Sequence, residues 1–221
     1  MPPRTIAIGD VHGCRIALDT LLDAVGPRAG DTIVTLGDYI DRGHDSRGVI
    51  DRLLDLRRRC RLVPLLGNHE QMLLDALVDP SRRRDWLEFG GVATLASYGD
   101  DTDFGAVPAA HVDFLESCLD YHETPTHLFL HASYDESLPM AEQSDYHLRW
   151  ESLRDRVPGP HASGKVAVVG HTSQKSGEVL DLGHLICIDT YCHGGGWLTA
   201  LDVDTGRIWQ ANDSGRLRGG S

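Results

Sequence analysis

The stretch Thr5-Ile6-Ala7-Ile8-Gly9-Asp10 joins a short apolar run to a glycine and then to a carboxylate. The same arrangement recurs at residues 32–38, 62–68 and 166–171, where the last residue is aspartate, asparagine and histidine in turn. Residues 126–131 form a variant without the glycine. Short apolar runs rich in β-branched residues and bounded by glycine are typical of buried strands. The recurrence therefore predicts several buried strands, each ending on a polar side chain.

Amphipathic segments separate the early strands. Residues 18–25 carry leucine and valine on one helical face, and Gly26-Pro27 is expected to end that helix. Strands that alternate with helices predict a layered α/β fold. Further helices are expected at residues 49–56 and 71–78, with weaker candidates at 83–98 and 110–119.

The last third of the chain has a different pattern. Beyond about residue 165 no helical periodicity remains, and apolar runs at 185–188, 197–201 and 207–209 are separated by glycine-containing turns. These runs predict consecutive strands in a meander that adds to the same sheet or to a facing one. The final residues, 214–221, are rich in glycine and arginine and are expected to be a frayed tail.

Composition narrows the class of protein. The chain has 221 residues and a formal net charge of −12, which argues against a protein that grips a nucleic-acid polymer. No apolar run approaches the ~20 residues that span a bilayer, and the first residues lack the apolar segment of a signal peptide. Five scattered cysteines without a C-x-x-C pair favour a reducing, cytoplasmic location. We therefore expect a cytoplasmic protein that uses neither a membrane nor a nucleic-acid polymer as its partner.

The polar residues at the strand ends are predicted to meet. In α/β sheets, ligands collect at the carboxyl edge of the strands, and a glycine before each polar residue lets the backbone turn sharply there. Carboxylates, imidazoles and an amide in one place suit manganese, iron or zinc, and the absence of cysteine disfavours a structural zinc site. The residues expected at this edge are Asp10, His12, Asp38, Asn68, His131 and His171.

The segments around these residues form a series of motifs. In this order they resemble the motifs of the calcineurin-like metallophosphoesterases, and the Asp-Arg-Gly of the second motif most resembles the phosphoprotein phosphatase branch, with its small bacterial and phage serine/threonine phosphatases. The resemblance runs from Thr5 to about Trp209. It implies an α/β fold, a layered β-sandwich with flanking helices and metals at the carboxyl edges of the strands, within one catalytic domain at residues 1–213. The motifs are Gly9-Asp10-Val11-His12-Gly13, Gly37-Asp38-Tyr39-Ile40-Asp41-Arg42-Gly43, Gly67-Asn68-His69-Glu70 and Gly170-His171-Thr172.

The resemblance also implies a metal centre. Asp10 and His12 would hold one divalent ion, Asp38 would bridge two, and the second ion would take its remaining ligands from three residues. Manganese is the expected metal, with iron or zinc as alternatives. Two such ions can share a water, lower its pKa and produce the hydroxide that attacks phosphorus. The ligands of the second ion would be Asn68, His131 and His171.

The same resemblance assigns the catalytic side chains. Arg42 would neutralise the phosphoryl oxygens, which its planar guanidinium can grip in pairs. His69 would be the general acid that protonates the leaving group, and Asp41 would orient its imidazole.

A second phosphate-binding arginine is less defined. Relatives often carry one just after a tryptophan, whereas here Arg149 and Arg154 lie on either side of that position, and we prefer Arg149. Tyr191 precedes a glycine-rich segment that either overhangs the site and contacts substrate or is simply a turn between two strands.

These features predict a metal-dependent serine/threonine protein phosphatase whose partner is a phosphorylated protein or peptide. The alternative is a hydrolase of dinucleoside polyphosphates such as diadenosine tetraphosphate, with a nucleotide as substrate. An adenine site needs stacking aromatic residues, which make up only 6% of the chain, although four could serve. A third hypothesis is an inactive phosphate-sensing scaffold. The candidate aromatic residues are Trp86, Tyr98, Tyr191 and Trp197.

Overall fold

The computed structural model describes residues 2–100 and 102–219. Its first sheet has the strand order β11-β10-β1-β2-β3. β1, β2 and β3 are parallel, whereas β10 is antiparallel to β1, to β11 and to β9. The parallel pairing places the carboxyl ends of the first three strands at one edge. The strands are β1 (Thr5–Ile8), β2 (Thr32–Thr35), β3 (Arg61–Pro64), β9 (Asp189–Thr190), β10 (Trp197–Asp202) and β11 (Ile208–Ala211).

The second sheet comes mostly from the middle of the chain. Its order is β4-β5-β6-β8-β7, with β5, β6 and β8 parallel and an antiparallel strand at each side. The strands are β4 (Tyr121–Glu123), β5 (His127–Leu130), β6 (Val166–Val169), β7 (Leu180–Asp181) and β8 (Leu185–Cys187).

The two sheets pack face to face. Ala7 and Val34 of the first sheet belong to the same buried cluster as Phe129 and Val168 of the second. Their sequence neighbours, such as Ile33, instead pack against helices on the outer face. Because side chains alternate along a strand, one strand can serve both layers. The α/β layered sandwich predicted from the sequence is confirmed.

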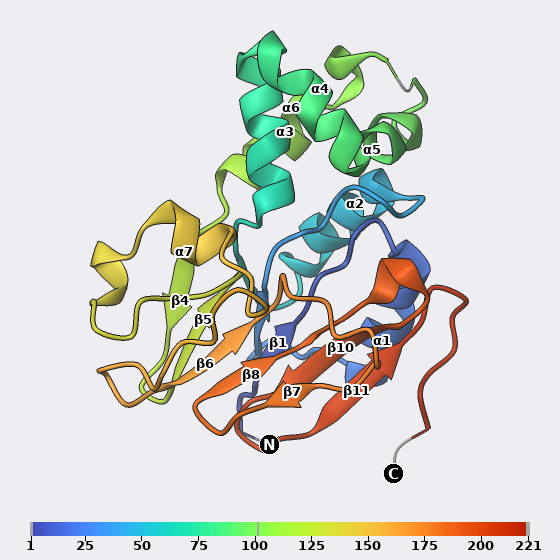
Figure 1. The fold of residues 1–221 in the computed structure, drawn as a ribbon. Helices are drawn as coiled ribbons and strands as arrows, with labels where there is room; N and C mark the ends of the chain where they lie inside the picture. Colours follow the sequence, from blue (N-terminus) through green and yellow to red (C-terminus); the bar gives the residue numbers. More distant parts are fainter. Residues whose placement is uncertain (1, 101, 220–221) are drawn as a thin grey trace.

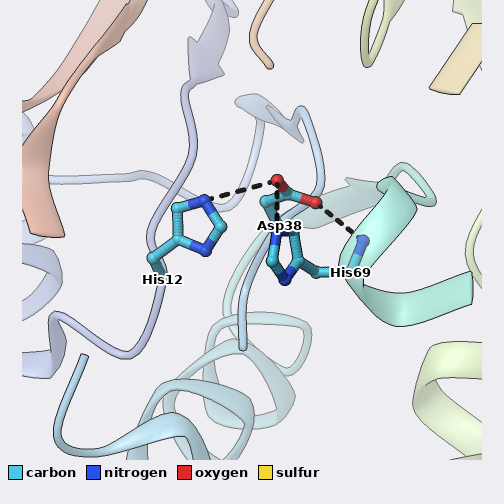
Figure 2. Close-up of side chains that lie close together, drawn as sticks. All are labelled: His12, Asp38 and His69. Atoms are coloured by element: carbon cyan, nitrogen blue, oxygen red, sulfur yellow. Dashed lines mark hydrogen bonds and ion pairs between the residues drawn. The ribbon is translucent and has the colours of Figure 1, made fainter. Parts of the chain in front are cut away.

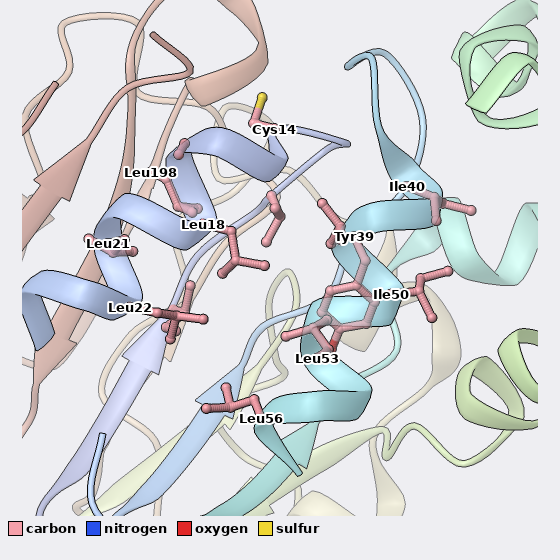
Figure 3. Close-up of a cluster of buried hydrophobic side chains, with 14 of the residues drawn as sticks. Cys14, Leu18, Leu21, Leu22, Tyr39, Ile40, Ile50, Leu53, Leu56 and Leu198 are labelled. Carbon is pink, nitrogen blue, oxygen red and sulfur yellow. The ribbon is translucent and has the colours of Figure 1, made fainter. Parts of the chain in front are cut away.

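Two helices cover the outer face of the first sheet. α1 (Arg15–Val25) and α2 (Ser46–Leu56) direct their leucine-rich faces into one buried cluster (Figure 3). α1 ends where Gly26 adopts the left-handed conformation, with φ of 56°, as Gly26-Pro27 predicts. Both helices confirm the predicted segments.

The chain between β3 and β4 is helical and groups at one end of the molecule (Figure 1). The weak candidate at 83–98 is not one regular helix, because a π-helical turn at Leu87–Gly91 interrupts it and Gly90 has φ of 115°. α7 (Asp145–Arg149) lies between β5 and β6. The helices of this insert are α3 (Asn68–Val78), α4 (Arg83–Trp86), α5 (Val92–Ser97) and α6 (Ala109–Glu116). Short 3₁₀ turns lie at Pro80–Arg82 and Phe104–Ala106 within the insert, and at Met140–Glu142 and Cys192–Gly194 outside it.

The C-terminal strands divide between the two sheets. β10 and β11 form the expected antiparallel hairpin, but β8 pairs with β6 and β7 in the second sheet. The chain crosses at Ile188, which is buried in the cluster between the sheets. The prediction of one continuous meander is therefore wrong for its first strand, β8, which belongs to the second sheet while β10 and β11 belong to the first.

The sequence predicts a frayed tail after Ser214. In the part that the structure describes, this segment runs back along β11. The Arg218 N–H donates to the carbonyl of Gln210 at 2.9 Å, and Leu217 bridges to Ala211. Residues 220–221 lie outside the described residues. Among the helices that the structure describes, none is long and apolar enough to cross a membrane.

Candidate active site

The predicted ligands gather where the parallel strands of both sheets end. Asp10, Asp38 and Asn68 follow β1, β2 and β3, whereas His131 and His171 follow β5 and β6. The backbone N–H of His171 donates to Asp10 Oδ2 at 2.9 Å, and Asn68 Oδ1 lies 3.0 Å from His131 Nε2. The two sheets therefore contribute to one cluster, as the sequence predicts.

Asp38 lies at the centre of this cluster. Its Oδ2 is 3.3 Å from His12 Nε2, and its Oδ1 is 3.4 Å from His131 Nε2 (Figure 2 shows the His12 side). Two groups of side chains could each hold an ion, and Asp38 belongs to both. This is the placement that a bridging ligand needs. The groups are His12, Asp38 and His69, and Asp38, His131 and His171.

The histidine rings are oriented by backbone carbonyls. His12 Nδ1 donates to Ile40 O at 2.9 Å, and His131 Nδ1 donates to Leu36 O at 2.7 Å. His171 uses the other nitrogen, because its Nε2 donates to Trp150 O at 3.1 Å. A carbonyl oxygen can only accept, so in the neutral form of each ring the remaining nitrogen carries a lone pair. Those lone pairs face Asp38 or Asn68, which is how histidines are prepared for a metal.

The charges in the cluster also favour a cation. Burial raises the pKa of Asp10 well above its ordinary value, and the carboxylates of Asp189 and Asp38 raise it further. Burial lowers the pKa of His12, and it lowers that of His171 to about 4. Neutral imidazoles among buried carboxylates form a suitable donor set for a divalent metal ion. The residues present therefore fit the metal centre that the motifs imply.

The imidazoles around Asp38 lower the pKa of its carboxyl group. Burial alone would raise the pKa of Asp38, but the adjacent His131, His69 and His12 rings outweigh burial and lower it. Asp38 is thus held as a carboxylate, the form that binds metal.

The backbone is strained at this site. Among the described residues other than glycine, all those with positive φ belong to the predicted site. Such a conformation is costly for side-chain-bearing residues and persists only where the surroundings enforce it. Gly170 and Gly67 contribute differently, because a Cβ at either position would collide with Asp10 or Asp38. The strained residues are His12 (φ 44°), Asp38 (50°), Asp41 (70°), Arg42 (69°), His171 (59°) and Tyr191 (66°).

Glu70, the last residue of the third motif, has no role predicted from the sequence, yet it holds the loop that carries Asp38. Its carboxylate accepts backbone N–H groups of Asp38 at 2.7 Å and Tyr39 at 2.8 Å, and it also caps α3 at Gly67. Burial, with the nearby Asp38, raises the pKa of Glu70 to about 8. The capping-box pattern, an acidic residue three positions into a helix, was the available sequence signal.

His69 and Asp41 form a buried pair. His69 Nδ1 lies 2.6 Å from Asp41 Oδ2, and His69 Nε2 has no hydrogen-bond partner among the described residues. Asp41 also accepts from Trp86 Nε1 at 2.9 Å and from Thr94 Oγ1 at 2.6 Å. The helical insert therefore fixes the carboxylate, while the free ring nitrogen of His69 lies 4.0 Å from Asp38 Oδ2. No sequence pattern indicates this role for Trp86 or Thr94.

The predicted arginines have different surroundings. Arg42 is exposed, and its Nη1 lies 2.9 Å from His12 Nε2. Arg149 is buried, and its two Nη atoms pair with Asp120 and Asp145, each at 2.6 Å. Arg154 is exposed and donates to the carbonyl of Ser173, two residues beyond His171.

The loop after β9 reaches the cluster through His193. The ring of His193 meets the ring of His12 edge-on, with centroids 4.6 Å apart. Tyr191 packs against His193, with ring centroids 4.9 Å apart. Tyr191 therefore borders the site through His193. Asp189, which was not predicted, acts through its charge on Asp10.

The layered fold and this cluster define a metal-binding hydrolase. The chain belongs to the calcineurin-like phosphoesterases, because the model of that family matches residues 3–204. This family uses a dinuclear metal site, and the described His and Asp groups are able to hold metal ions.

Curated relatives match over part of their length. A symmetrical bis(5'-nucleosyl)-tetraphosphatase of Acidovorax sp. is 40% identical over 84 residues, which are 37% of this chain and 29% of the relative. Serine/threonine-protein phosphatase 1 of Salmonella typhimurium is 40% identical over 85 residues, 38% of this chain and 37% of the relative. The chain thus aligns with roughly a third of the length of these relatives.

Solved structures share the fold over nearly the whole chain. A putative diadenosine tetraphosphatase superimposes with a TM-score of 0.72 at 24% identity, covering 96% of this chain and 95% of its own. A cold-active protein tyrosine phosphatase gives a TM-score of 0.68 at 19% identity, covering 99% and 78%.

Proposed function

We propose that the chain removes phosphate from phosphoserine and phosphothreonine side chains of proteins or peptides. The proposed metal ligands are Asp10, His12, Asp38, Asn68, His131 and His171, and Mn²⁺ is the ion that we expect them to hold, with iron or zinc as alternatives. When bound, two such ions would supply a hydroxide near neutral pH and neutralise charge on the phosphoryl group. The complete donor set argues against an inactive scaffold.

The pairing of His69 with Asp41 is the observation that carries this proposal. A serine or threonine alkoxide is a poor leaving group, so the departing oxygen needs a proton as the ester bond breaks. His69 offers an unpartnered, buried Nε2 directed toward Asp38, and Asp41 holds the opposite nitrogen at 2.6 Å. An anhydride, whose leaving group is a phosphate, has less need of this donor. The dyad therefore favours an alkyl ester as substrate.

Two arginines are proposed to bind the phosphoryl oxygens. Arg42 lies beside His12 at the exposed side of the cluster, where a guanidinium can grip two oxygens. Of the two candidates for the second arginine, Arg154 has the better placement, because both Nη atoms of Arg149 already pair with carboxylates.

A substrate panel tests the function. The protein loaded with Mn²⁺ is assayed with phosphoserine, phosphothreonine and phosphotyrosine peptides and with diadenosine tetraphosphate. We expect the highest kcat/KM with the phosphoserine or phosphothreonine peptides, and loss of all activity with a chelator. Turnover that survives exhaustive chelation would contradict the metal-dependent scheme.

Hydrolysis of dinucleoside polyphosphates is the second candidate function. It is supported by the tetraphosphatases among the relatives and by aromatic side chains beside the site. Trp86, one of the residues considered for adenine stacking, shares a cavity with Phe89 and Trp150.

A further inference from the structure

The segment between β9 and β10 contains a histidine that has no role in the proposed catalytic scheme. The segment begins at Tyr191, in the left-handed conformation, and continues through a 3₁₀ turn at Cys192–Gly194 into the glycines at 195 and 196. From the sequence it is either a loop at the site or a simple turn between strands. The surroundings of His193 distinguish these two interpretations.

The glycines let this segment fold tightly around the ring of Tyr191. A Cβ at Gly194 would collide with that ring, and Gly195 has φ of 93°, a conformation that favours glycine. Cys192 is buried in the core that α1 and α2 also share. The segment is therefore anchored in a defined shape, and it holds His193 in one place.

His193 lies against the candidate metal centre. Its ring packs against that of His12 at an interplanar angle of 78° and against that of Tyr191 at 71°. Burial lowers the pKa of His193 to about 4, and the nearby charges of Arg42 and His69 act in the same direction. His193 is thus within electrostatic reach of the residues proposed to bind the phosphoryl group and to protonate the leaving group.

One nitrogen of this histidine lacks a partner. Nδ1 of His193 is buried but makes no hydrogen bond to any described residue. A buried polar atom without a partner costs free energy, so such an atom at a site is explained best by a ligand that satisfies it. The ring of His69, which also packs against His12, has an unpartnered buried nitrogen too. Two unpartnered imidazole nitrogens therefore flank His12.

Direct binding of a metal ion is the alternative role for His193. In each metal-capable group of described residues, the donor atoms lie within 4.8 Å of one another, and His193 belongs to neither group. Its ring nevertheless contacts His12, a member of one of them. His193 is therefore better placed to contact a group bound at the metal centre than to bind an ion itself.

We infer that His193 donates a hydrogen bond to an oxygen of the bound phosphoryl group, beside Arg42. The inference rests on the proposed phosphoester hydrolysis and adds a substrate-binding residue to it. A transferred phosphoryl group has three equatorial oxygens. Arg42 can grip two of them, which leaves one for another donor. A neutral imidazole has one N–H, which either ring nitrogen can carry, and its hydrogen bond to an anionic oxygen is of the stronger kind.

Two variants separate hydrogen bonding from packing. His193→Phe keeps an aromatic ring against His12 but has no N–H, whereas His193→Gln keeps a donor and loses the ring. Inorganic phosphate is titrated calorimetrically into the proteins loaded with Mn²⁺. We expect His193→Phe to weaken phosphate binding roughly tenfold to hundredfold, because a hydrogen bond to a charged group is lost. His193→Gln should lose less than about fivefold, since a donor remains. His122→Gln, which changes a half-buried histidine on β4, should bind phosphate as the wild type does.

Turnover and metal content complete the test. kcat/KM should fall by the same factor with a phosphothreonine peptide and with p-nitrophenyl phosphate, because both carry the same phosphoryl group, and both variants at His193 should keep the metal content of the wild type. A larger loss of phosphate binding in His193→Gln than in His193→Phe would assign the ring to packing and overturn the inference. Equal losses, no loss in either variant, a missing ion, or a wild-type protein that binds no phosphate would overturn it as well. If phosphate binding follows the expected order but neither ester is hydrolysed, the proposed function fails while this contact stands.

Discussion

The two sheets contribute unequally to the candidate site. On the first-sheet side, each of β1, β2 and β3 runs through a loop into a helix. These loops carry Asp10 and Asp38, and the first turn of α3 carries Asn68 and His69. On the second-sheet side, β5 and β6 each contribute a single histidine. Groups able to bind phosphate or to transfer a proton lie mainly on the first side. The second side supplies ligands that hold and position a metal.

The supporting contacts follow the same division. The Asp38 loop is fixed by Glu70, and the adjoining Asp41 by Trp86 and Thr94, all within buried hydrogen bonds. His131 and His171 are each oriented by one backbone carbonyl. We therefore expect substitutions of the second-side histidines to affect metal binding alone, whereas substitutions on the first side can affect metal binding, proton transfer or both.

Asp38→Asn should have the largest effect because Asp38 belongs to both metal-capable groups. We expect loss of both ions and a fall in kcat on the order of 10⁴-fold, since the ions supply several kcal/mol of transition-state stabilisation. His131→Ala should lose mainly one ion. Metal content measured by mass spectrometry checks the difference, and a variant at Asp38 that keeps two ions would remove its bridging role.

His69→Ala should come next and should discriminate between substrates. Loss of a general acid lowers the rate by roughly 10²–10³-fold with an alkyl phosphate. An aryl phosphate needs less protonation and should lose far less. Parallel kcat/KM measurements on a phosphothreonine peptide and p-nitrophenyl phosphate check this, and equal losses would assign His69 to metal binding, as its place in the His12–Asp38 group also permits.

Much of this centre could be predicted because its signal is local. A strand, a glycine and a polar residue are adjacent in sequence, so Asp10, Asp38 and His171 could be placed at strand ends before any contact was known. Local amphipathic periodicity likewise predicts α1 and α2 and where they end, although both helices begin three residues earlier than predicted.

The features that were missed depend on contacts between distant residues. The assignment of β8 and β10 to different sheets is invisible in their apolar runs. Trp86 and Thr94 reach Asp41 from 45 and 53 positions away. The interruption of the helix at Gly90 reflects its packing against Arg42, which no periodicity encodes.

Trp86→Phe should weaken the support for Asp41 while keeping an aromatic ring in place. The variant loses one hydrogen bond to a carboxylate, so we expect about a tenfold fall in kcat with alkyl phosphates. Aryl phosphates should be little affected, and metal content should stay normal, because Trp86 acts through Asp41 and His69. Phe104→Leu, a change to the ring that packs on Trp86 at 5.4 Å, is the matched control for packing alone. A fall that is equal for alkyl and aryl substrates would indicate only a structural role.

Arg149→Met should have the smallest effect, although the sequence favours Arg149 as the second phosphate clamp. Both of its Nη atoms are paired with carboxylates of Asp120 and Asp145, so its removal costs stability more than activity. We expect a lower Tm with kcat/KM within about twofold of wild type. Arg154→Ala should instead raise KM roughly tenfold, as expected when a charged hydrogen bond to phosphate is lost. The reverse outcome, a large KM change at Arg149 and none at Arg154, would mean that Arg149 leaves its carboxylate partners for substrate. Phosphate binding would then require a conformational change that frees Arg149 from Asp120 and Asp145.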